Sequence, residues 1–439
     1  MHQTIGQSAT TSKFTHVSTW TTLLLLFYFA SRGTLWFYSN GRDDMLLRTA
    51  GLARRHAVST EARAIEMLAF VLLLLPVCMK IRSVVHEFRR YAIFAALALL
   101  ASISSLWSQD PVTSFSLSLF IWVDTLFAYY LYDTFSFEEW LRVLAICGWI
   151  CFTVSAILAI FFPAFGLEPS SSDGAWRGMY GNKNPCAEMT VLFLIATTYI
   201  RARTALLLLN RVLFLSASVF LIATTHSATG EVLLAAFVAH WLISAAIMRI
   251  NAKGRVYLVI VGVMCLGALS FWVFPNVSAF TESLGKESTL TGRTDIWRVA
   301  IIFISKSPWI GYGYRAFWHG VNGESSIAMV GSFMPLHAHN GLLEIWLELG
   351  IVGVGLICTA ILKALRDYLT CSGDNDRLVN YSACMVIVIG IYSCVESSFM
   401  VPNDLAWIIL IVASLHLGDA RSARMARQGQ LMPLTADAG

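Results

Sequence analysis

Apolar runs about the length of a membrane helix recur along the chain and constrain its fold more than any other feature. A helix needs about 20 residues, usually 17–25, to cross roughly 30 Å of hydrocarbon. Runs of this kind lie near residues 19–38, 64–79, 91–107, 112–132, 141–162, 186–200, 205–224, 231–248, 255–274, 341–362, 379–399 and 404–418. Because backbone amides in lipid must bond within their own segment, each run predicts a helix and not a strand. We therefore expect an all-α, polytopic membrane protein with about 12 transmembrane helices.

Composition agrees with a membrane protein and excludes several other classes. Of the 439 residues, 57% are hydrophobic and 13% charged, whereas about a quarter of the residues in a soluble protein are charged. The net charge of +4 gives no electrostatic reason to expect a nucleic-acid partner. The nine cysteines form no C-x-x-C pair, so neither a disulfide framework nor a zinc site is indicated. The partner expected from composition is the lipid bilayer.

Lysine and arginine gather in alternate loops, which predicts the orientation. The basic loops lie within 80–90, 201–211, 249–255 and 363–377, and the tail adds 421–427. The positive-inside rule places them in the cytoplasm. The expected organisation is an N-terminal cytoplasmic tail at 1–18, helices 1–9 within 19–274, a long periplasmic loop at 275–340, helices 10–12 within 341–418, and a C-terminal cytoplasmic tail at 419–439. Residues 39–63 carry five arginines on the side that should face outward, so the topology of 19–63 stays open.

The predicted loop 275–340 is rich in aromatic residues, including Trp297, Trp309 and Trp318, so we expect it to fold. Loops of this length are usually functional or disordered. Thr294 is expected to cap a short amphipathic helix on the outer membrane surface. The apolar face of that helix would comprise Ile296, Trp297, Ala300, Ile301 and Ile304.

One group of polar residues lies where this loop meets the run 341–362. Asn340, Glu344 and Glu348 follow at i, i+4 and i+8, so they share a helix face. Carboxylates in or near a membrane span need partners or a cavity. The glycines Gly350, Gly353 and Gly355 follow and would permit close helix contact.

His339 precedes this group and is the candidate general base, because histidine has an ordinary pKa near 6.5. A neighbouring glutamate, Glu344, would orient the ring. The alternative is a hydrogen-bonded histidine that only anchors the loop. His337 and His339 together offer two metal ligands, but no carboxylate pair follows at a useful spacing, so no metal site is predicted.

Cationic residues on the predicted outer side form a second group, where the positive-inside rule disfavours them. They are Arg293, Arg177, Lys183 beside Asn184, and Arg315. The planar donor fork of arginine suits phosphate oxygens, which predicts a lipid-linked phosphate or pyrophosphate as ligand. The alternative for Arg293 is a structural ion pair, for example with Asp295 or Glu344.

Three further glutamates, Glu188, Glu231 and Glu396, lie in apolar runs. Each could line a central cavity or pair with a neighbouring helix, and the sequence does not separate these possibilities. The segment His226–Thr229 is expected to cap the helix that follows it.

Several of these segments resemble the O-antigen ligase/polymerase family, and within it the exopolysaccharide polymerases of the succinoglycan type. The segments are Thr291–Trp297, Ser307–Gly313, and Ala338–Asn340 with Glu344, Glu348, Gly350 and Gly353. Trp107–Pro111 and Trp176–Asn184 add to the resemblance, which runs from about residue 90 to 418. One departure is Ser227-Ala228-Thr229, where the family often has a cation in the middle position.

The resemblance implies a bundle like that of the GT-C glycosyltransferases, with a periplasmic active site in the inner membrane. Such enzymes take a glycan from undecaprenyl pyrophosphate and need no metal, cofactor or nucleotide sugar. Arg293 would then hold the pyrophosphate and His339 would activate the acceptor hydroxyl, with Glu344 as a third catalytic residue. The expected substrate-binding residues are Arg177, Lys183, Asn184, Arg315, Asn340, Trp297, His337 and Glu348. A chain-length regulator or export machinery would be the protein partner.

The expected function is inverting polymerisation of lipid-linked repeat units into exopolysaccharide. One alternative is a ligase that transfers a finished glycan to lipid A-core or protein. An alternative of another class is a transporter or flippase for an anionic glycolipid. Transporters often contain internal repeats, and the sequence shows none, which favours an enzyme.

Overall fold

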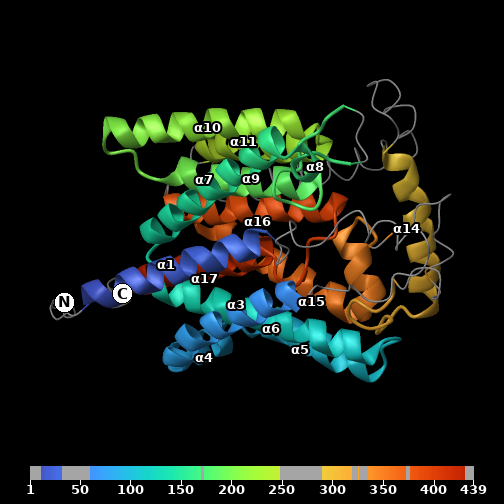
Figure 1. Ribbon diagram of the computed structural model, residues 1–439. Helices are drawn as coiled ribbons and strands as arrows, with labels where there is room; N and C mark the ends of the chain where they lie inside the picture. The colour runs from blue at the N-terminus through green and yellow to red at the C-terminus, as the bar shows by residue number, and fades with distance from the viewer. Residues whose placement is uncertain are drawn as a thin grey trace, which may run out of the picture.

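The protein is a bundle of helices in every part that the computed structural model describes, namely residues 11–31, 60–169, 173–247, 289–318, 325, 335, 337–371 and 376–430. The helices are α1 (Thr11–Ala30), α3 (Thr60–Met79), α4 (Ile81–Arg90), α5 (Ala92–Ile103), the 3₁₀ helix η1 (Ser104–Leu106), α6 (Pro111–Thr134), α7 (Phe137–Phe161), α8 (Pro163–Gly166), α9 (Lys183–Tyr199), α10 (Ala205–Thr225), α11 (Ala228–Ile247), α14 (Thr289–Lys306), α15 (Gly341–Cys371), α16 (Arg377–Val395) and α17 (Leu405–Gln430). Most run side by side (Figure 1). These residues confirm the all-α prediction.

The number of membrane-crossing helices is confirmed only in part. Among the described residues, six helices are long and apolar enough to cross a membrane, or seven if the bent pair α3 and α4 forms one span. Shorter apolar helices lie at Thr21–Ala30, Ala92–Leu106 and Ala228–Ser244. The predicted span 255–274 lies outside the described residues, and every other predicted run contains a helix. The protein is thus a multi-pass membrane protein, while the prediction of about 12 spans stays a prediction.

Burial separates the central helices from the peripheral ones. In α17, 78% of the apolar window is buried inside the protein, whereas in α10 only 22% is. The outer face of α10 instead exposes Leu206, Leu209, Leu213 and Phe220. Apolar side chains in a continuous exposed band suit contact with lipid and not with water. The centre of the bundle is therefore α17, with α16, α15 and α6 beside it.

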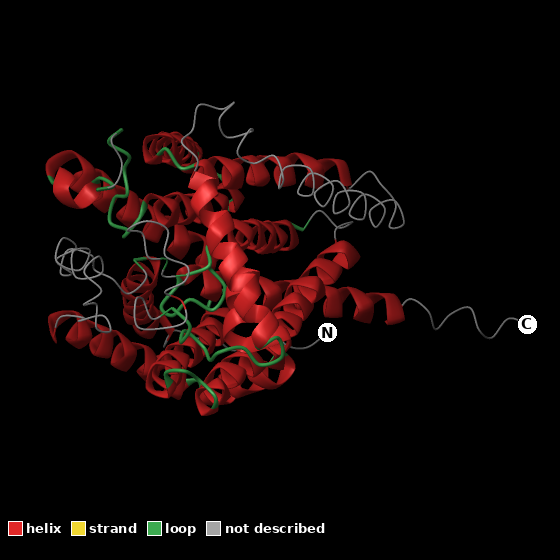
Figure 2. Ribbon diagram, turned by 90° about the vertical axis from the view of Figure 1, so that its right-hand side faces the viewer, coloured by secondary structure: helices red, strands yellow, loops and turns green. Residues whose placement is uncertain are grey.

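Helix α14 lies across one end of the bundle, roughly perpendicular to the long helices (Figure 1), and Figure 2 looks onto that end. The predicted start at Thr294 was wrong, because the helix begins at Thr289 and Thr294 lies inside it. The apolar face was predicted in part. Ile296, Ala300 and Ile304 are buried, but Ile301 is 56% exposed. Ile304 joins two residues outside the predicted face, Val299 and Phe303, in a small core with Phe317 and with Leu347 of α15. This core fixes α14 to the bundle.

A backbone break in α15 allows the segment after α14 to enter the bundle. Gly350 has φ 68° and ψ −169° inside this helix, a region that is essentially restricted to glycine. The amide of Ile351 donates to the Pro308 carbonyl at 2.9 Å, and the Leu347 carbonyl accepts from Tyr312 at 2.9 Å. The break thus exchanges helical hydrogen bonds for bonds to residues 308–313. The predicted role of Gly350 in helix–helix contact was wrong, since its neighbour is this loop.

We predict that Gly350→Ala destabilises the protein by at least about 2 kcal/mol, because a side chain there would adopt a strained backbone region. The added Cβ would also lie 2.1 Å from the Trp309 carbonyl oxygen. Gly355→Ala in the same helix is the matched control, because its Cβ would meet nothing within 4 Å. The melting temperatures of the detergent-purified variants measure the difference. Equal melting of both variants would show that the break is not required.

Candidate functional site

The carboxylate of Glu396 joins four segments that lie far apart in the sequence. Glu396 follows directly after α16 and is buried. Its Oε1 accepts hydrogen bonds from Arg293 Nη2 and from Asn184 Nδ2, both at 2.7 Å. Its Oε2 lies 2.9 Å from His339 Nδ1. The two residues predicted to carry the chemistry, Arg293 and His339, therefore meet on one carboxylate.

Arg293 is fixed by a second hydrogen bond, from Nη1 to the Val395 carbonyl at 2.7 Å. This carbonyl belongs to the last turn of α16, where the helix dipole favours a cation. The alternative prediction for Arg293, a structural ion pair, was correct, but the partner is neither Asp295 nor Glu344. Asp295 instead pairs with Arg298 at 2.8 Å, and Arg293 pairs with Glu396.

His339 occupies a strained turn before α15. Its φ is 49°, and a residue other than glycine is uncommon in the left-handed region. Its amide donates to Nδ1 of His337 at 3.3 Å, and the two rings lie 4.0 Å apart between centroids. Trp297 Nε1 donates to the carbonyl of the preceding Ala338 at 2.8 Å. When neutral His339 donates its Nδ1 hydrogen to Glu396, Nε2 is the basic atom of the ring.

Glu344 does not orient the His339 ring as predicted. It is buried and accepts hydrogen bonds from Trp318 Nε1 at 2.9 Å and from the Ala338 amide at 2.5 Å. It therefore holds the segment just before His339, while the turn at His339 directs the ring toward Glu396. Glu396 was not predicted from the sequence as a site residue. The feature that could have indicated it is its position as a glutamate at the end of an apolar run.

Polar residues near the Glu396 carboxylate fix the starts of helices α15 and α9. Asn340 Oδ1 caps α15 by accepting from the Leu342 and Leu343 amides at 3.1 Å, and its Nδ2 donates to the Cys394 carbonyl at 3.1 Å. These bonds fix the start of α15 against the end of α16.

At the start of α9, Asn184 links Glu396 to a second turn. Its Oδ1 accepts from Ser227 Oγ at 2.8 Å, and Ser227 Oγ accepts from the Gly230 amide at 3.2 Å. The predicted cap of α11 is thereby confirmed. Lys183 lies beside Asn184 with a half-buried side chain, and its amide donates to Glu168 Oε2 at 3.1 Å.

The remaining predicted cations have partners within the protein. Arg177 is 4% exposed and donates to the carbonyls of Phe165 at 3.0 Å and Ala164 at 3.3 Å. Burial lowers the pKa of Arg177, against the opposing effect of Glu168. Burial also lowers the pKa of Arg315, but the nearby Glu348 carboxylate contributes most to a net rise. Glu348 itself is buried in α15 and is not presented to solvent.

The structure also assembles a group that could hold a metal. His337, His339 and Glu396 each offer one ligand atom, and these atoms lie within 4.8 Å of one another. The sequence argument against a metal had found no carboxylate close by, and the structure supplies one from 57 residues further along the chain. A divalent cation would compete with Arg293 for that carboxylate, and a metal-independent site stays a prediction.

Comparisons with known proteins agree with the resemblance. A family model described as O-antigen ligase matches residues 189–358. The exopolysaccharide production protein ExoQ of Rhizobium meliloti is 24% identical over 387 residues, which are 84% of this chain and 87% of that protein. A putative polysaccharide ligase of Rickettsia felis is 32% identical over 116 residues, 25% of this chain and 28% of that protein. A similar protein of Rickettsia conorii is 29% identical over the same length. The predicted resemblance to the O-antigen ligase family is confirmed by these matches.

The ionisation of Glu396 should stabilise the folded protein. Burial raises its pKa, but the hydrogen bond from His339 and the charges of His339 and Arg293 lower it from 4.5 to about 2. A lowered pKa adds stability that is complete above pH 4.5 and is lost as the pH falls toward 2. Glu396→Gln should therefore lower the free energy of unfolding by about 3 kcal/mol at pH 7, since each unit of pKa shift corresponds to about 1.4 kcal/mol.

Denaturation of the purified protein and its variant at pH 7, 4 and 3 measures this difference, which should shrink only below pH 4.5. Asp295→Asn is the control, because its exposed pair with Arg298 contributes little. A Glu396→Gln protein as stable at pH 7 as the original would contradict the assignment.

Proposed function

We propose that this member of the O-antigen ligase family polymerises oligosaccharide repeat units carried on undecaprenyl pyrophosphate at the periplasmic face of the inner membrane. The observation that carries the proposal is the shared carboxylate of Glu396, which holds Arg293 and His339 side by side. Arg293 supplies a fixed positive charge and His339 supplies a base. Transfer from a pyrophosphate requires both groups.

In the proposed reaction, His339 Nε2 removes the proton from the attacking sugar hydroxyl. The hydroxyl oxygen forms a bond to the anomeric carbon of the donor as the bond from that carbon to the pyrophosphate oxygen breaks, with inversion. Glu396 holds the ring through Nδ1 and stabilises the imidazolium that forms, as a carboxylate does in a serine-protease triad. Glu396 thus takes the orienting role first assigned to Glu344.

The leaving pyrophosphate gains negative charge, which Arg293 stabilises. Its guanidinium has five N–H donors, and Glu396 and Val395 engage two of its nitrogens. Lys183 at the start of α9 adds a second cation, at a helix end that favours anions. Asn184, Asn340 and Trp297 act as positioning residues for these groups, and His337 lies against the base. Arg177, Arg315 and Glu348 support the surrounding loops.

We predict that His339→Ala lowers transfer about 10²–10⁴-fold, the usual effect of losing a general base. Cells that carry this variant should accumulate single lipid-linked repeat units, which gel electrophoresis of extracted lipid-linked glycans detects. His86→Ala is the control, because His86 lies on the exposed side of α4. Normal long polymer in the His339→Ala strain would rule out the base.

Arg293→Gln should lower the rate about 10²–10³-fold, the typical cost of removing one donor that stabilises charge in a transition state. Arg298→Gln is the matched control, because it is on the same helix with a side chain that is 72% exposed. Incorporation of radiolabelled lipid-linked repeat units in membrane preparations compares the two. Equal losses in both variants would point to a general effect of charge on α14.

A ligase is the second candidate, because the Rickettsia relatives are named putative polysaccharide ligases. The length of the glycan on the lipid carrier in a deletion strain distinguishes the two functions. Loss of a polymerase leaves single units, whereas loss of a ligase leaves long lipid-linked polymer. A polymerase would also work with a chain-length regulator or export machinery.

A further inference from the structure

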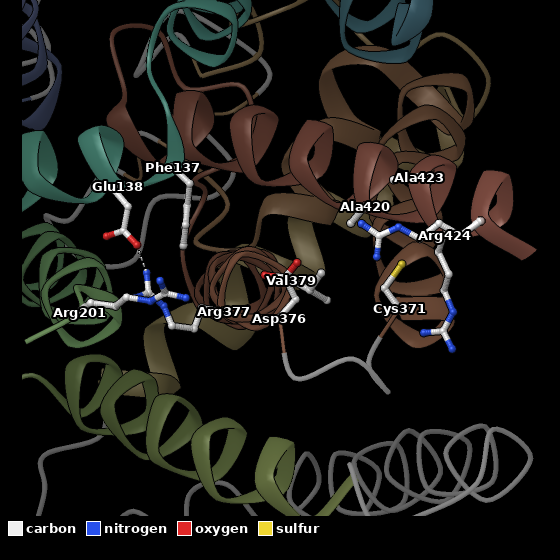
Figure 3. A pocket seen from close by; sticks show the side chains of 11 residues that line it. Phe137, Glu138, Arg201, Cys371, Asp376, Arg377, Val379, Ala420, Ala423 and Arg424 are labelled. Atoms are coloured by element: carbon white, nitrogen blue, oxygen red, sulfur yellow. Dashed lines mark hydrogen bonds and ion pairs between the residues drawn. The ribbon is translucent and has the colours of Figure 1, made fainter. Parts of the chain in front are cut away.

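An arginine-lined pocket, shown in Figure 3, opens near the start of α16, at the opposite end of this helix from Glu396. Arg377 begins α16 and Glu396 follows its last residue, so about 28 Å of helix separates the two ends at 1.5 Å per residue. The pocket has a volume of about 430 Å³. It is lined by Phe137, Glu138, Arg201, Cys371, Asp376, Arg377, Val379, Ala420, Ala423, Arg424 and Arg427.

The charges of this pocket do not balance. Four arginines face two carboxylates across it, and both carboxylates have partners within the protein. Glu138 accepts from Arg377 Nη2 at 2.5 Å, and Asp376 caps α16 by accepting from the Leu378 amide at 2.9 Å. The pocket therefore carries a positive surplus, and the α16 N-terminus adds to it.

One of these arginines, Arg377, is also preorganised. The Arg377 guanidinium lies 5.7 Å from the centroid of the Phe137 ring and is held by Glu138. Arg201 and Arg211 lie close enough to Arg377 for their positive charges to repel its own. Figure 3 shows Arg201 and Arg377 together on one side and Arg424 on the other. A ligand that enters would meet guanidinium groups from two directions, and such groups suit phosphate oxygens.

The position of the pocket indicates which phosphate it would meet. It lies where α7 and α16 begin and α15 ends, at the ends of three helices that are long and apolar enough to cross a membrane. Its wall also includes apolar residues, among them Val379 and Ala420. Basic pockets between membrane helices on the side of the positive loops bind anionic headgroups.

We infer that this pocket binds the phosphate of an anionic phospholipid headgroup in the leaflet opposite the proposed active site. The inference rests on the pocket alone and does not depend on the proposed glycosyl transfer. The same phosphate chemistry could come from a soluble anion, and the experiment separates the two sources.

Native mass spectrometry of the full-length protein in detergent, titrated with phosphatidylglycerol or phosphatidylcholine, tests this. The double variant Arg201→Gln, Arg424→Gln should bind phosphatidylglycerol about thirtyfold more weakly, because each basic residue near an anionic surface strengthens binding about fivefold. Arg82→Gln, Arg203→Gln is the control, with the same loss of charge at exposed residues outside the pocket. Its affinity should equal that of the original protein. Size-exclusion profiles check that both variants fold.

A second measurement uses inorganic phosphate and records thermal stability. If phosphate stabilises the original protein but not the double variant, and phosphatidylglycerol binds no better than phosphatidylcholine, the ligand is soluble and the lipid assignment is overturned. If the double variant and the control bind phosphatidylglycerol equally, the pocket is not an anion site. Arg427→Gln, at the exposed edge of the pocket, should give an intermediate loss of affinity.

Discussion

A carboxylate buried at the end of a membrane helix is costly unless opposite charge and hydrogen-bond donors surround it. Glu396 meets that condition with three side chains, Arg293, His339 and Asn184. Each comes from a different segment, so the carboxylate fixes the positions of α9, α14 and the start of α15 relative to α16. The contacts that order this end of the bundle are therefore the same contacts that assemble the site. A residue that first looked like one of several unexplained glutamates determines both.

The helices could be predicted because a long apolar run has few alternatives in a membrane. The partner of His339 could not, because it depends on a contact between segments 57 residues apart. The spacing within one helix suggested Glu344, which is nearer in sequence. The predicted span 379–399 also placed Glu396 inside the membrane, whereas α16 ends at Val395 and leaves Glu396 at its C-terminus. An error of a few residues at a helix end thus concealed the central residue of the site.

The path of the chain between α14 and α15 was beyond prediction for a different reason. Gly350 was read as a small residue for helix contact, and only its backbone conformation shows that it opens α15. The opened carbonyls of Leu347 and Glu348 accept from Tyr312 and Gly313, both at 2.9 Å. Local sequence carries no information about which distant amides will use such carbonyls. In the described part of the predicted loop, Phe317 and Trp318 pack together with α14 and α15, as the aromatic content predicted.

The positive-inside rule was most informative where the chain departs from it. Arg293 and Arg177 lie in segments predicted to face outward, and both are committed to acceptors within the protein. By contrast, Arg298 is exposed and pairs only with its helix neighbour Asp295. The two arginines that are buried on the unexpected side are thus held by acceptors of the protein itself, whereas the exposed one is not. A pyrophosphate at Arg293 would have to share the guanidinium with Glu396, because removing that pair would leave the carboxylate buried without its cation. In the proposed transfer, the pyrophosphate would therefore bind the N–H donors of Arg293 that Glu396 does not engage, and the charge that stabilises the fold would also stabilise the leaving group.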